Sequence, residues 1–463
     1  MNRENLNKEI IRLAAPAILN NITVPLLGLC DTAIAGHLGS PSYLGAVSIG
    51  AMMLNVFFWL AGFLRMGTTG LTARGYGRAS AIECREVLRK SLILAGGISI
   101  LILLLQVPLQ KLLIQLIAPD SDIADLASLY FRIGVWGVPA QLAVMAVSGW
   151  FIGMQTTVVP MTIAIGTNII NILASIGFAF GLGWGFRGII CGTLCANWIG
   201  AIAALTWAWI RYRNTGLEDR EKTFRLSERE NVLKGNPKEE EIGKRGESVR
   251  WRELFSVNGA LFIRSACIMA VSLTVTSVGA RLGDLTLAAN AIIMQFFLFF
   301  SYFMDGFAFS GEALAGKYFG AGRYEMIKAT MKSLCGWGVV MAVIFFSIYY
   351  FGSRPITALL TDSAQVIAEA EKYRLWILLL PPVTVAAFIF DGLFVGLTRT
   401  RAMMAVTIAG AAVFFILLFL CRIPLGNNLL WLSFECYLFI RGAALAVLFL
   451  RLSRNNFESK GWN

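Results

Sequence analysis

The chain has 463 residues, of which 57% are hydrophobic and only 15% are charged, and its mean hydropathy is +0.68. A soluble globular protein carries about 25% charged residues, so this composition excludes a disordered chain, a disulfide-stabilised scaffold and an ordinary soluble enzyme. The net charge of +12 does not indicate nucleic-acid binding, because 22 of the charged residues lie within residues 211–253 and the others separate apolar runs. The sequence predicts an all-α integral membrane protein.

Twelve apolar runs are long enough to cross a bilayer, because about 20 apolar residues in a helix span its hydrocarbon core. Glycine, proline or charged residues separate one run from the next. In chain order the predicted helices cover residues 8–36, 43–73, 89–116, 126–153, 158–182, 188–211, 253–281, 285–316, 327–350, 372–397, 402–424 and 428–451.

Positively charged residues gather on one side of these predicted helices. The gaps on the side of the N-terminus hold 29 Lys and Arg residues, and those on the other side hold 7. Such a bias marks the cytoplasmic side, so we expect both termini in the cytoplasm. Glu4 and Glu9 stand where a cleavable signal peptide would be basic, so we expect none.

The second half of the chain repeats the first at an offset of about 243 residues. Residues 148–157 (SGWFIGMQTT) align with residues 391–400 (DGLFVGLTRT), and Pro139 aligns with Pro382. A charged segment, 212–252, separates the two copies. The sequence therefore predicts two pseudo-symmetric six-helix bundles, 1–211 and 253–463, joined by a cytoplasmic linker at 212–252. Transporters built from such repeats bind substrate between them.

Acidic residues inside the predicted helices are the first candidates for function, because a charge at the bilayer centre costs at least about 2.5 kcal/mol. We interpret Glu435 as a structural partner of Arg441, which follows six residues later in the same predicted helix. For the acids of the helix 285–316, a structural pair and a functional role remain equally open. The five acids are Asp31, Asp305, Glu312, Asp391 and Glu435.

Asp31 is the strongest candidate, because no basic residue lies near it in the sequence. A buried carboxyl group without a cation holds a proton more readily than an exposed one, so Asp31 is suited to binding and releasing a proton. Pro16 and Pro25 precede it in the same predicted helix, and each removes a backbone donor and permits a bend. A structural role, with hydrogen bonds to neighbouring Thr and Asn side chains, is the alternative.

Other polar residues add little that would indicate an enzyme. Asn168 and Asn171 lie three residues apart on one face of the predicted helix 158–182, where they either join helices or help form a site. His37 is the only histidine, and no pair of cysteines has the spacing of a metal or redox motif. Residues 311–317 come close to a phosphate-binding loop, but Tyr318 replaces the required Ser or Thr. We expect no catalysis, no bound metal and no cofactor.

Three segments resemble one family of transporters. They are residues 21–38 (NITVPLLGLCDTAIAGHL), residues 64–73 (LRMGTTGLTA), and Leu282-Gly283 together with residues 305–309 (DGFAF). They are similar to the multidrug and toxic compound extrusion (MATE) transporters, and within these to the branch of DNA-damage-inducible protein F. The resemblance covers nearly the whole chain except the central loop. It implies twelve helices in two lobes, a place in a bacterial inner membrane, and an antiporter that expels cationic or amphipathic compounds in exchange for H⁺ or Na⁺.

The resemblance also assigns roles in the N-terminal lobe. Asp31 matches the acid that couples transport to ion entry, and Pro16 matches the proline about which the first helix bends. Three further residues match polar positions of the cavity around that acid: Tyr130, Asn171 and Thr193. Ser175 occupies a position at which many relatives carry a second acid, which argues against a Na⁺ site in this lobe.

In the C-terminal lobe the match is less complete. Asp391 matches an acid that helps bind a cation in some relatives, and Asp305 is a further candidate. The acid that accompanies it in the seventh helix is absent here, and that helix holds Asn258 and Arg264 instead. An arginine near the cavity disfavours a bound cation.

We therefore predict a multidrug efflux antiporter coupled to H⁺, with Asp31 as the coupling residue. A Na⁺-coupled exporter is the alternative, because Na⁺ would need several oxygen ligands where a proton needs one acid. A lipid-linked precursor flippase is less favoured, because such proteins carry a strongly basic cavity. The expected partners are small amphipathic or cationic molecules and the lipid bilayer, with no nucleic acid, and we expect a monomer.

Overall fold

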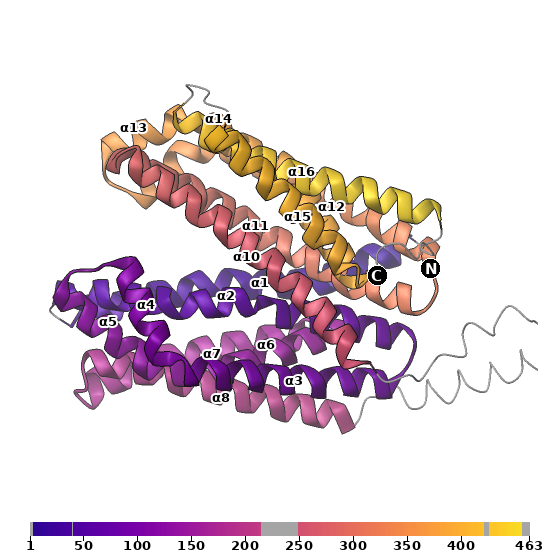
Figure 1. The fold of residues 1–463 in the computed structure, drawn as a ribbon, viewed down its shortest axis with the longest axis horizontal. Coiled ribbons are helices and arrows are strands. Elements are labelled where there is room, and N and C mark those ends of the chain that lie inside the picture. Colours follow the sequence, from indigo (N-terminus) through magenta and orange to yellow (C-terminus); the bar gives the residue numbers. More distant parts are fainter. Residues whose placement is uncertain (1–2, 39, 214–248, 421–425, 456–463) are drawn as a thin grey trace, which may run out of the picture. The chain divides into compact units, whose positions relative to one another are not determined.

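The structure is a computed structural model that describes residues 3–38, 40–213, 249–420 and 426–455. Within these residues every regular element is a helix (Figure 1). The first half contains α1 (Arg3–Gly36), α2 (Pro41–Gly77), α3 (Ala81–Leu104), α4 (Gln106–Ile117), α5 (Ser121–Gly134), η1 (Val135–Gly137), α6 (Val138–Gly153), α7 (Val158–Ile176), η2 (Gly177–Gly181) and α8 (Phe186–Arg213). The second half contains α10 (Trp251–Arg281), α11 (Asp284–Gly320), α12 (Tyr324–Leu360), α13 (Ala364–Lys372), α14 (Arg374–Gly396), α15 (Thr400–Phe415), η5 (Ile416–Leu420) and α16 (Asn427–Arg454).

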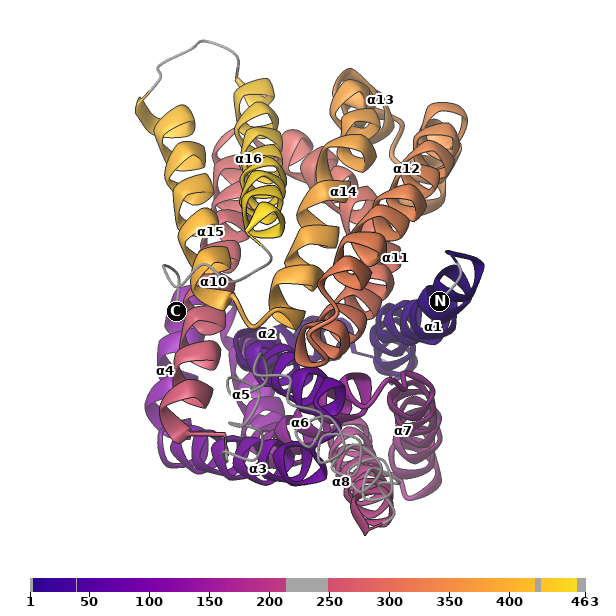
Figure 2. The ribbon, with the colours of Figure 1, turned by 90° about the vertical axis from the view of Figure 1, so that its right-hand side faces the viewer.

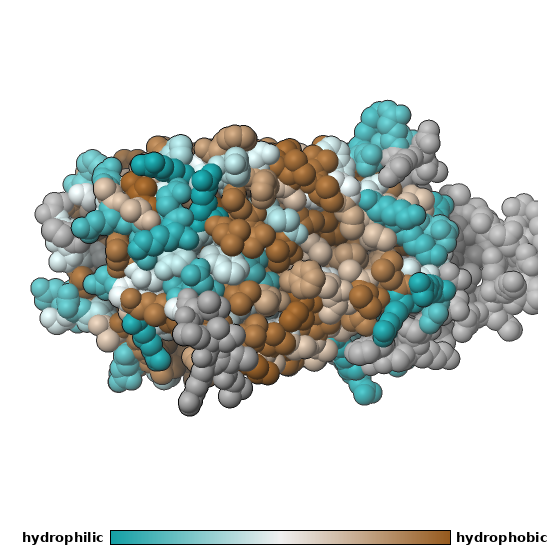
Figure 3. All heavy atoms as spheres, turned by 90° about the horizontal axis from the view of Figure 1, so that it is seen from above, coloured by the Kyte–Doolittle hydropathy of each residue, from teal (hydrophilic) through white to brown (hydrophobic). Residues whose placement is uncertain are grey.

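Twelve of the described helical segments are long and apolar enough to cross a membrane, which confirms the predicted number of spans and the fold class. Their outer surfaces are apolar: the exposed fraction is 76% for Leu104, 80% for Phe351 and 85% for Leu359. Figure 3 shows hydrophobic side chains over much of the middle of one face, with hydrophilic ones gathered toward its ends. Large exposed apolar surfaces of this kind need lipid around them.

The helix boundaries differ from the predictions in several places. The predicted helix 89–116 is two helices, α3 and α4, which separate at Leu105. Pro108 explains the break, because it has no N–H to donate to the carbonyl of Leu104. The predicted helix 372–397 corresponds to α14, and the short helix α13 before it was not predicted. The helix predicted to end at residue 350 continues to Leu360 as α12. The predicted linker 212–252 lies mostly outside the described residues, and so do residues 421–424 of the predicted helix 402–424.

Contacts divide the chain into two compact units. Residues 19–254 form the first, called here the N-unit, and residues 1–18 with 255–463 form the second, the C-unit. Figure 2 shows the helices of each unit running side by side. The first helix α1 is continuous, but residues up to Ile18 belong to the C-unit and residues from Leu19 onward to the N-unit.

The two units repeat one packing scheme. In the N-unit α6 packs against α2, α3 and α8, and in the C-unit α14 packs against α11, α12 and α16. The closest approaches coincide as well. A Cβ atom on Gly149 would come closer than 3.0 Å to the carbonyl oxygen of Arg65, and one on Gly392 would do the same with that of Ala308. Both pairs of positions differ by 243, so the packing repeats at the offset predicted from the sequence.

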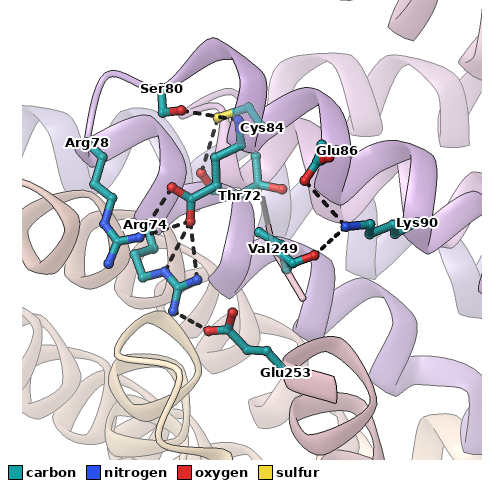
Figure 4. A network of polar contacts seen from close by, with 10 residues as sticks. Thr72, Arg74, Arg78, Ser80, Cys84, Glu86, Lys90, Val249 and Glu253 are labelled. Carbon is teal, nitrogen blue, oxygen red and sulfur yellow. Dashed lines mark hydrogen bonds and ion pairs between the residues drawn. The ribbon is translucent and has the colours of Figure 1, made fainter. Parts of the chain in front are cut away.

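An ion-pair network joins the beginning of α10 to the N-unit (Figure 4). The Arg74 guanidinium on α2 lies 3.2 Å from the Glu83 carboxylate on α3 and 2.5 Å from that of Glu253 on α10. Lys90 on α3 donates to the carbonyl oxygen of Val249, just before α10. The first residues of α10 are therefore held by helices of the first repeat.

The C-unit contains the counterpart of this network. Lys317, 243 residues after Arg74, forms an ion pair with Glu9 near the beginning of α1. The Tyr318 hydroxyl donates to the other oxygen of Glu9 at 3.1 Å, and the Ser310 hydroxyl donates to the Ile10 carbonyl at 3.0 Å. The first helix of each repeat thus begins on the unit formed by the other repeat.

Candidate functional site

Asp31 lies on α1, in the part of that helix that belongs to the N-unit, and its side chain is buried, with an exposed fraction of 8%. Its Oδ1 atom has no hydrogen-bond partner within the described part of the chain. No Lys, Arg or His of the described residues forms an ion pair with it. The helix itself is intact here, since Thr32 donates to the Gly28 carbonyl at 2.7 Å. The carboxyl group is thus buried without a counter-charge among the described residues.

Four predicted cavity residues form one polar cluster near Asp31. Tyr130 on α5 interacts electrostatically with Asp31 and with Thr193 on α8. The Asn171 amide on α7 donates to the Thr193 hydroxyl at 3.2 Å, and the Ser175 hydroxyl donates to the Asn171 side-chain oxygen at 3.3 Å. The structure therefore brings together residues from α1, α5, α7 and α8 that the sequence places far apart.

Asn168 takes a different position from Asn171. Its amide donates to the Thr23 carbonyl at 3.4 Å, and this bond joins α7 to α1 two residues before Pro25. Pro25 itself is exposed, and Pro16 lies two residues before the boundary between the units. Both prolines lie inside a continuous helix, so each leaves one carbonyl group of α1 without its usual donor.

The C-unit places a different group of charges at its centre. Asp391 on α14 accepts hydrogen bonds from Arg264 on α10 and Arg441 on α16, both at its Oδ2 atom. Arg441 also donates to the Tyr437 hydroxyl at 3.1 Å. All three charged side chains are buried, with exposed fractions of 5% to 7%. Two arginines therefore share one aspartate, and this cluster carries a net positive charge.

The predicted pair of Glu435 with Arg441 is wrong. Both carboxylate oxygens of Glu435 are buried and have no hydrogen-bond partner among the described residues, while Arg441 bonds to Asp391. The reason is geometric, because residues six apart in a helix point away from each other, whereas residues three or four apart share a face. Arg441 bonds to Asp391 instead, and Glu435 is left without an ion-pair partner among the described residues.

The other two candidates of the C-unit make no hydrogen bond to Asp391 within the described residues. Asn258 is buried on α10, six residues before Arg264, and Asp305 is half-buried on α11. Within the described residues the hydrogen bonds to Asp391 come from the two arginines. No group of three or more His, Cys, Asp or Glu side chains that could hold a metal ion occurs in the described residues.

A family model of transporters, MatE, matches residues 16–176 and 260–420 of this chain. The chain belongs to the MATE family. It is 34% identical over 453 residues to the DNA damage-inducible protein F of Escherichia coli, a match that covers 97% of this chain and 93% of the relative. It is 26% identical over 346 residues to a probable multidrug resistance protein NorM of Deinococcus radiodurans, covering 73% and 69%. Its fold is similar to that of the Vibrio cholerae MATE transporter VcmN in the bent form, with a TM-score of 0.79, 16% identity and 98% of both chains covered.

As a MATE transporter, the chain is a multi-pass membrane protein whose family moves small molecules and contains no enzymes. This confirms the prediction of a transporter and of the family. The two matched segments, 16–176 and 260–420, correspond to the two repeats.

In this MATE transporter, sequence reasoning missed the role of Arg441. The residue was noted as a possible partner for an intramembrane acid, and Asp391 was not singled out as that acid. The two lie 50 positions apart on different helices, so no local spacing links them. One indication was available. Arg264 and Arg441 both lie within predicted helices of the second half, where the resemblance suggests a cation site.

Proposed function

We propose that this MATE transporter exports cationic or amphipathic compounds in exchange for protons, with Asp31 as the coupling residue. The observation that carries the proposal is the state of Asp31. It is buried, one of its oxygens has no hydrogen-bond partner in the described residues, and no cation neutralises it. A carboxyl group in such a place is more stable when protonated. Gaining or losing one proton therefore changes the free energy of this site considerably.

The polar cluster beside Asp31 supports a role in binding substrate as well as protons. Tyr130, Asn171 and Thr193 offer hydroxyl and amide groups next to the acid. When Asp31 is ionised, its charge attracts a cationic substrate, and the neighbouring polar groups complete the hydrogen bonds of that substrate. When it is protonated, the attraction is lost and substrate leaves. One acid thus serves both ligands in turn, which is what an antiporter requires.

The C-unit supports a proton over Na⁺ as the coupling ion. The acid that corresponds to a cation site in some relatives, Asp391, is already bonded to Arg264 and Arg441. A Na⁺ ion would have to approach two guanidinium groups, which repel it. A proton does not need this acid, because Asp31 suffices.

Helix α1 supplies the element that could respond to Asp31. It carries Asp31 in the N-unit, its first residues pack in the C-unit, and Pro16 and Pro25 lie between. A helix that lacks two backbone hydrogen bonds bends there more easily than elsewhere. We propose that protonation of Asp31 favours one bend of this helix. We also propose that both termini face the cytoplasm, on the basis of the charge bias.

Proteoliposomes with an imposed pH gradient test the proposal. Purified Asp31→Asn should lose pH-driven efflux of a fluorescent cation such as ethidium, while its unfolding temperature remains that of the wild type. Asp122→Asn is the matched control, because it makes the same chemical change at an exposed position of the same unit and should transport normally.

Two outcomes would contradict the proposal. Wild-type efflux by Asp31→Asn would exclude this residue as the coupling site. Efflux by the wild type that depends on a Na⁺ gradient, and persists when the pH is equal on both sides, would instead favour the Na⁺-coupled exporter.

A further inference from the structure

Glu435 is an intramembrane acid to which the proposed mechanism gives no role. It lies on α16, its exposed fraction is 5%, and neither carboxylate oxygen has a hydrogen-bond partner among the described residues. Its nearest candidate cation on the same helix, Arg441, is bonded to Asp391. A buried carboxylate with neither cation nor donor is very unfavourable, so the side chain needs a ligand.

The contacts on either side of Glu435 show which way it faces. Asn428 and Gly442 lie seven residues before and after it, so all three share one face of α16. The Trp376 indole on α14 donates to the Asn428 side-chain oxygen at 2.9 Å. A Cβ on Gly442 would lie 2.8 Å from that of Ala386, also on α14. Glu435 therefore faces α14 midway between these two contacts.

The facing stretch of α14 offers Glu435 no hydrogen-bond donor. Between Trp376 and Ala386 its side chains are apolar except that of Thr384, whose hydroxyl donates to the Leu380 carbonyl within the same helix. The Trp376 indole already donates to Asn428. Two prolines also lie in this stretch, and neither has an N–H group. The carboxylate of Glu435 therefore finds no free side-chain donor on this part of α14.

The charged and titratable groups around Glu435 do not supply that donor. On α16 the nearest are Cys436 and Tyr437, which are uncharged, and Arg441, which bonds to Asp391 on α14. On α15 the only charged side chain is that of Arg401, at the beginning of the helix, which donates to Ser256 on α10. From α11 the contact to this part of α16 is made by Asn290, whose neutral amide bonds to Trp431. On α14 the charged groups are Arg374, which donates to the Tyr350 carbonyl, and Asp391. Glu435 forms no ion pair with a charged group of these described helices.

We propose that Glu435 forms a second proton-binding site of this transporter, in the C-unit. A proton removes the charge of this buried carboxylate, which no cation or donor of the described helices around it stabilises. The side chain offers two carboxylate oxygens, fewer ligands than Na⁺ usually takes. This proposal rests on the proton-coupled function proposed above, and it adds a carrier that Asp31 does not provide.

Infrared difference spectroscopy of the full-length protein in lipid tests the site without transport. A protonated carboxyl group has a carbonyl stretch that disappears when the pH is raised. We expect such a band in Asp31→Asn, where the carboxyl group of Asp31 cannot contribute, and its loss when Glu435→Gln is added to that variant. Glu325→Gln in the same background is the control, because Glu325 is an exposed acid paired with Lys328. A band that persists in the Asp31→Asn, Glu435→Gln double variant, or one that is removed by Na⁺ at constant pH, would overturn the proposal.

Transport stoichiometry gives a second measurement. In proteoliposomes, the number of protons moved per ethidium should fall by about half in Glu435→Gln, since each carboxyl group carries a single proton. An unchanged ratio would overturn the proposal, whereas efflux by Asp31→Asn would overturn the function and leave the infrared result standing. If Glu435→Gln does not fold, Glu435→Asp keeps an acid one methylene shorter. Its carboxyl band should shift, and an unshifted band would likewise contradict the site.

Discussion

Asp31 in the N-unit and Asp391 in the C-unit are both buried aspartates on membrane-spanning helices, and they differ in what surrounds them. Each has one carboxylate oxygen without a hydrogen-bond partner in the described residues, but Asp31 has neutral neighbours such as Tyr130. Asp391 accepts hydrogen bonds from Arg264 and Arg441. One acid is free to exchange a proton at modest cost, and the other is fixed as the anion between two cations. The same residue type is therefore suited to coupling in one unit and to structure in the other.

The packing of the two units does not share this difference. Gly149 and Gly392 make the same close approach to a backbone carbonyl group, and α6 and α14 contact equivalent helices. The repeat thus preserves the shape of the helix bundle while its buried charges have diverged. The two units share their helix packing but not their buried charged residues. The role of a residue in one unit therefore cannot be assigned to the aligned residue of the other unit by alignment alone.

The largest expected effect on stability is that of Asp391→Asn. Removing the carboxylate that bonds both Arg264 and Arg441 takes away the anion that these two buried guanidinium groups share, which costs about 3–5 kcal/mol of unfolding free energy. Asp31→Asn removes a carboxyl group without a cation and should cost less than about 1 kcal/mol. Reversible unfolding in mixed detergent micelles, followed by tryptophan fluorescence, measures both values.

A second substitution sharpens this test. Adding Arg441→Gln to Asp391→Asn removes one of the two unbalanced charges and should recover part of the lost stability. If Asp391→Asn alone unfolds like the wild type, the arginines are neutralised by another group, and the contrast between the two aspartates fails.

Sequence reasoning recovered the parts of the structure that depend on local pattern. The twelve spans follow from the length of the apolar runs, and the 243-residue offset that aligned Pro139 with Pro382 also relates Gly149 to Gly392. Asp31 could be singled out because no basic residue lies near it in the sequence, and none of the described residues forms an ion pair with it in the structure. These features need only composition, periodicity and repetition.

The parts that were missed depend on side-chain direction across helices. Glu435 and Arg441 are near in sequence but lie on different faces of α16, whereas Asp391 and Arg441 are far apart and meet. The ion pair of Lys317 with Glu9 joins residues 308 positions apart, and no local signal marks it. Which of several buried acids meets which arginine is decided by rotation of each helix about its own axis, and the hydropathy pattern of these nearly all-apolar helices leaves that rotation undetermined.

The next largest effects should be equal in the two units. Gly149→Ala and Gly392→Ala each add a methyl group where a backbone carbonyl oxygen already lies closer than 3.0 Å. Because a backbone cannot yield as a side chain can, each should lower the unfolding free energy by about 1–3 kcal/mol. Gly166→Ala is the control, since nothing lies within 4 Å of the added atom. A large difference between Gly149→Ala and Gly392→Ala would show that the packing is less symmetric than the helix contacts indicate.

The smallest effects concern the ion pairs that hold the first helix of each repeat. Glu9→Gln removes the carboxylate that bonds both Lys317 and Tyr318, and should cost about 1 kcal/mol. Glu253→Gln should cost only a few tenths of a kcal/mol, because Arg74 keeps its contact with Glu83 and because the Glu253 side chain is 36% exposed.

A charge exchange, Glu9→Lys with Lys317→Glu, should restore most of the stability lost in Glu9→Gln, and double-mutant cycles on unfolding free energy measure the coupling. If Glu9→Gln and Glu253→Gln lower the unfolding free energy equally, the contact of Arg74 with Glu83 does not compensate for the loss of the Glu253 carboxylate. The two attachments would then be equivalent, and the difference between the units would be confined to the buried aspartates.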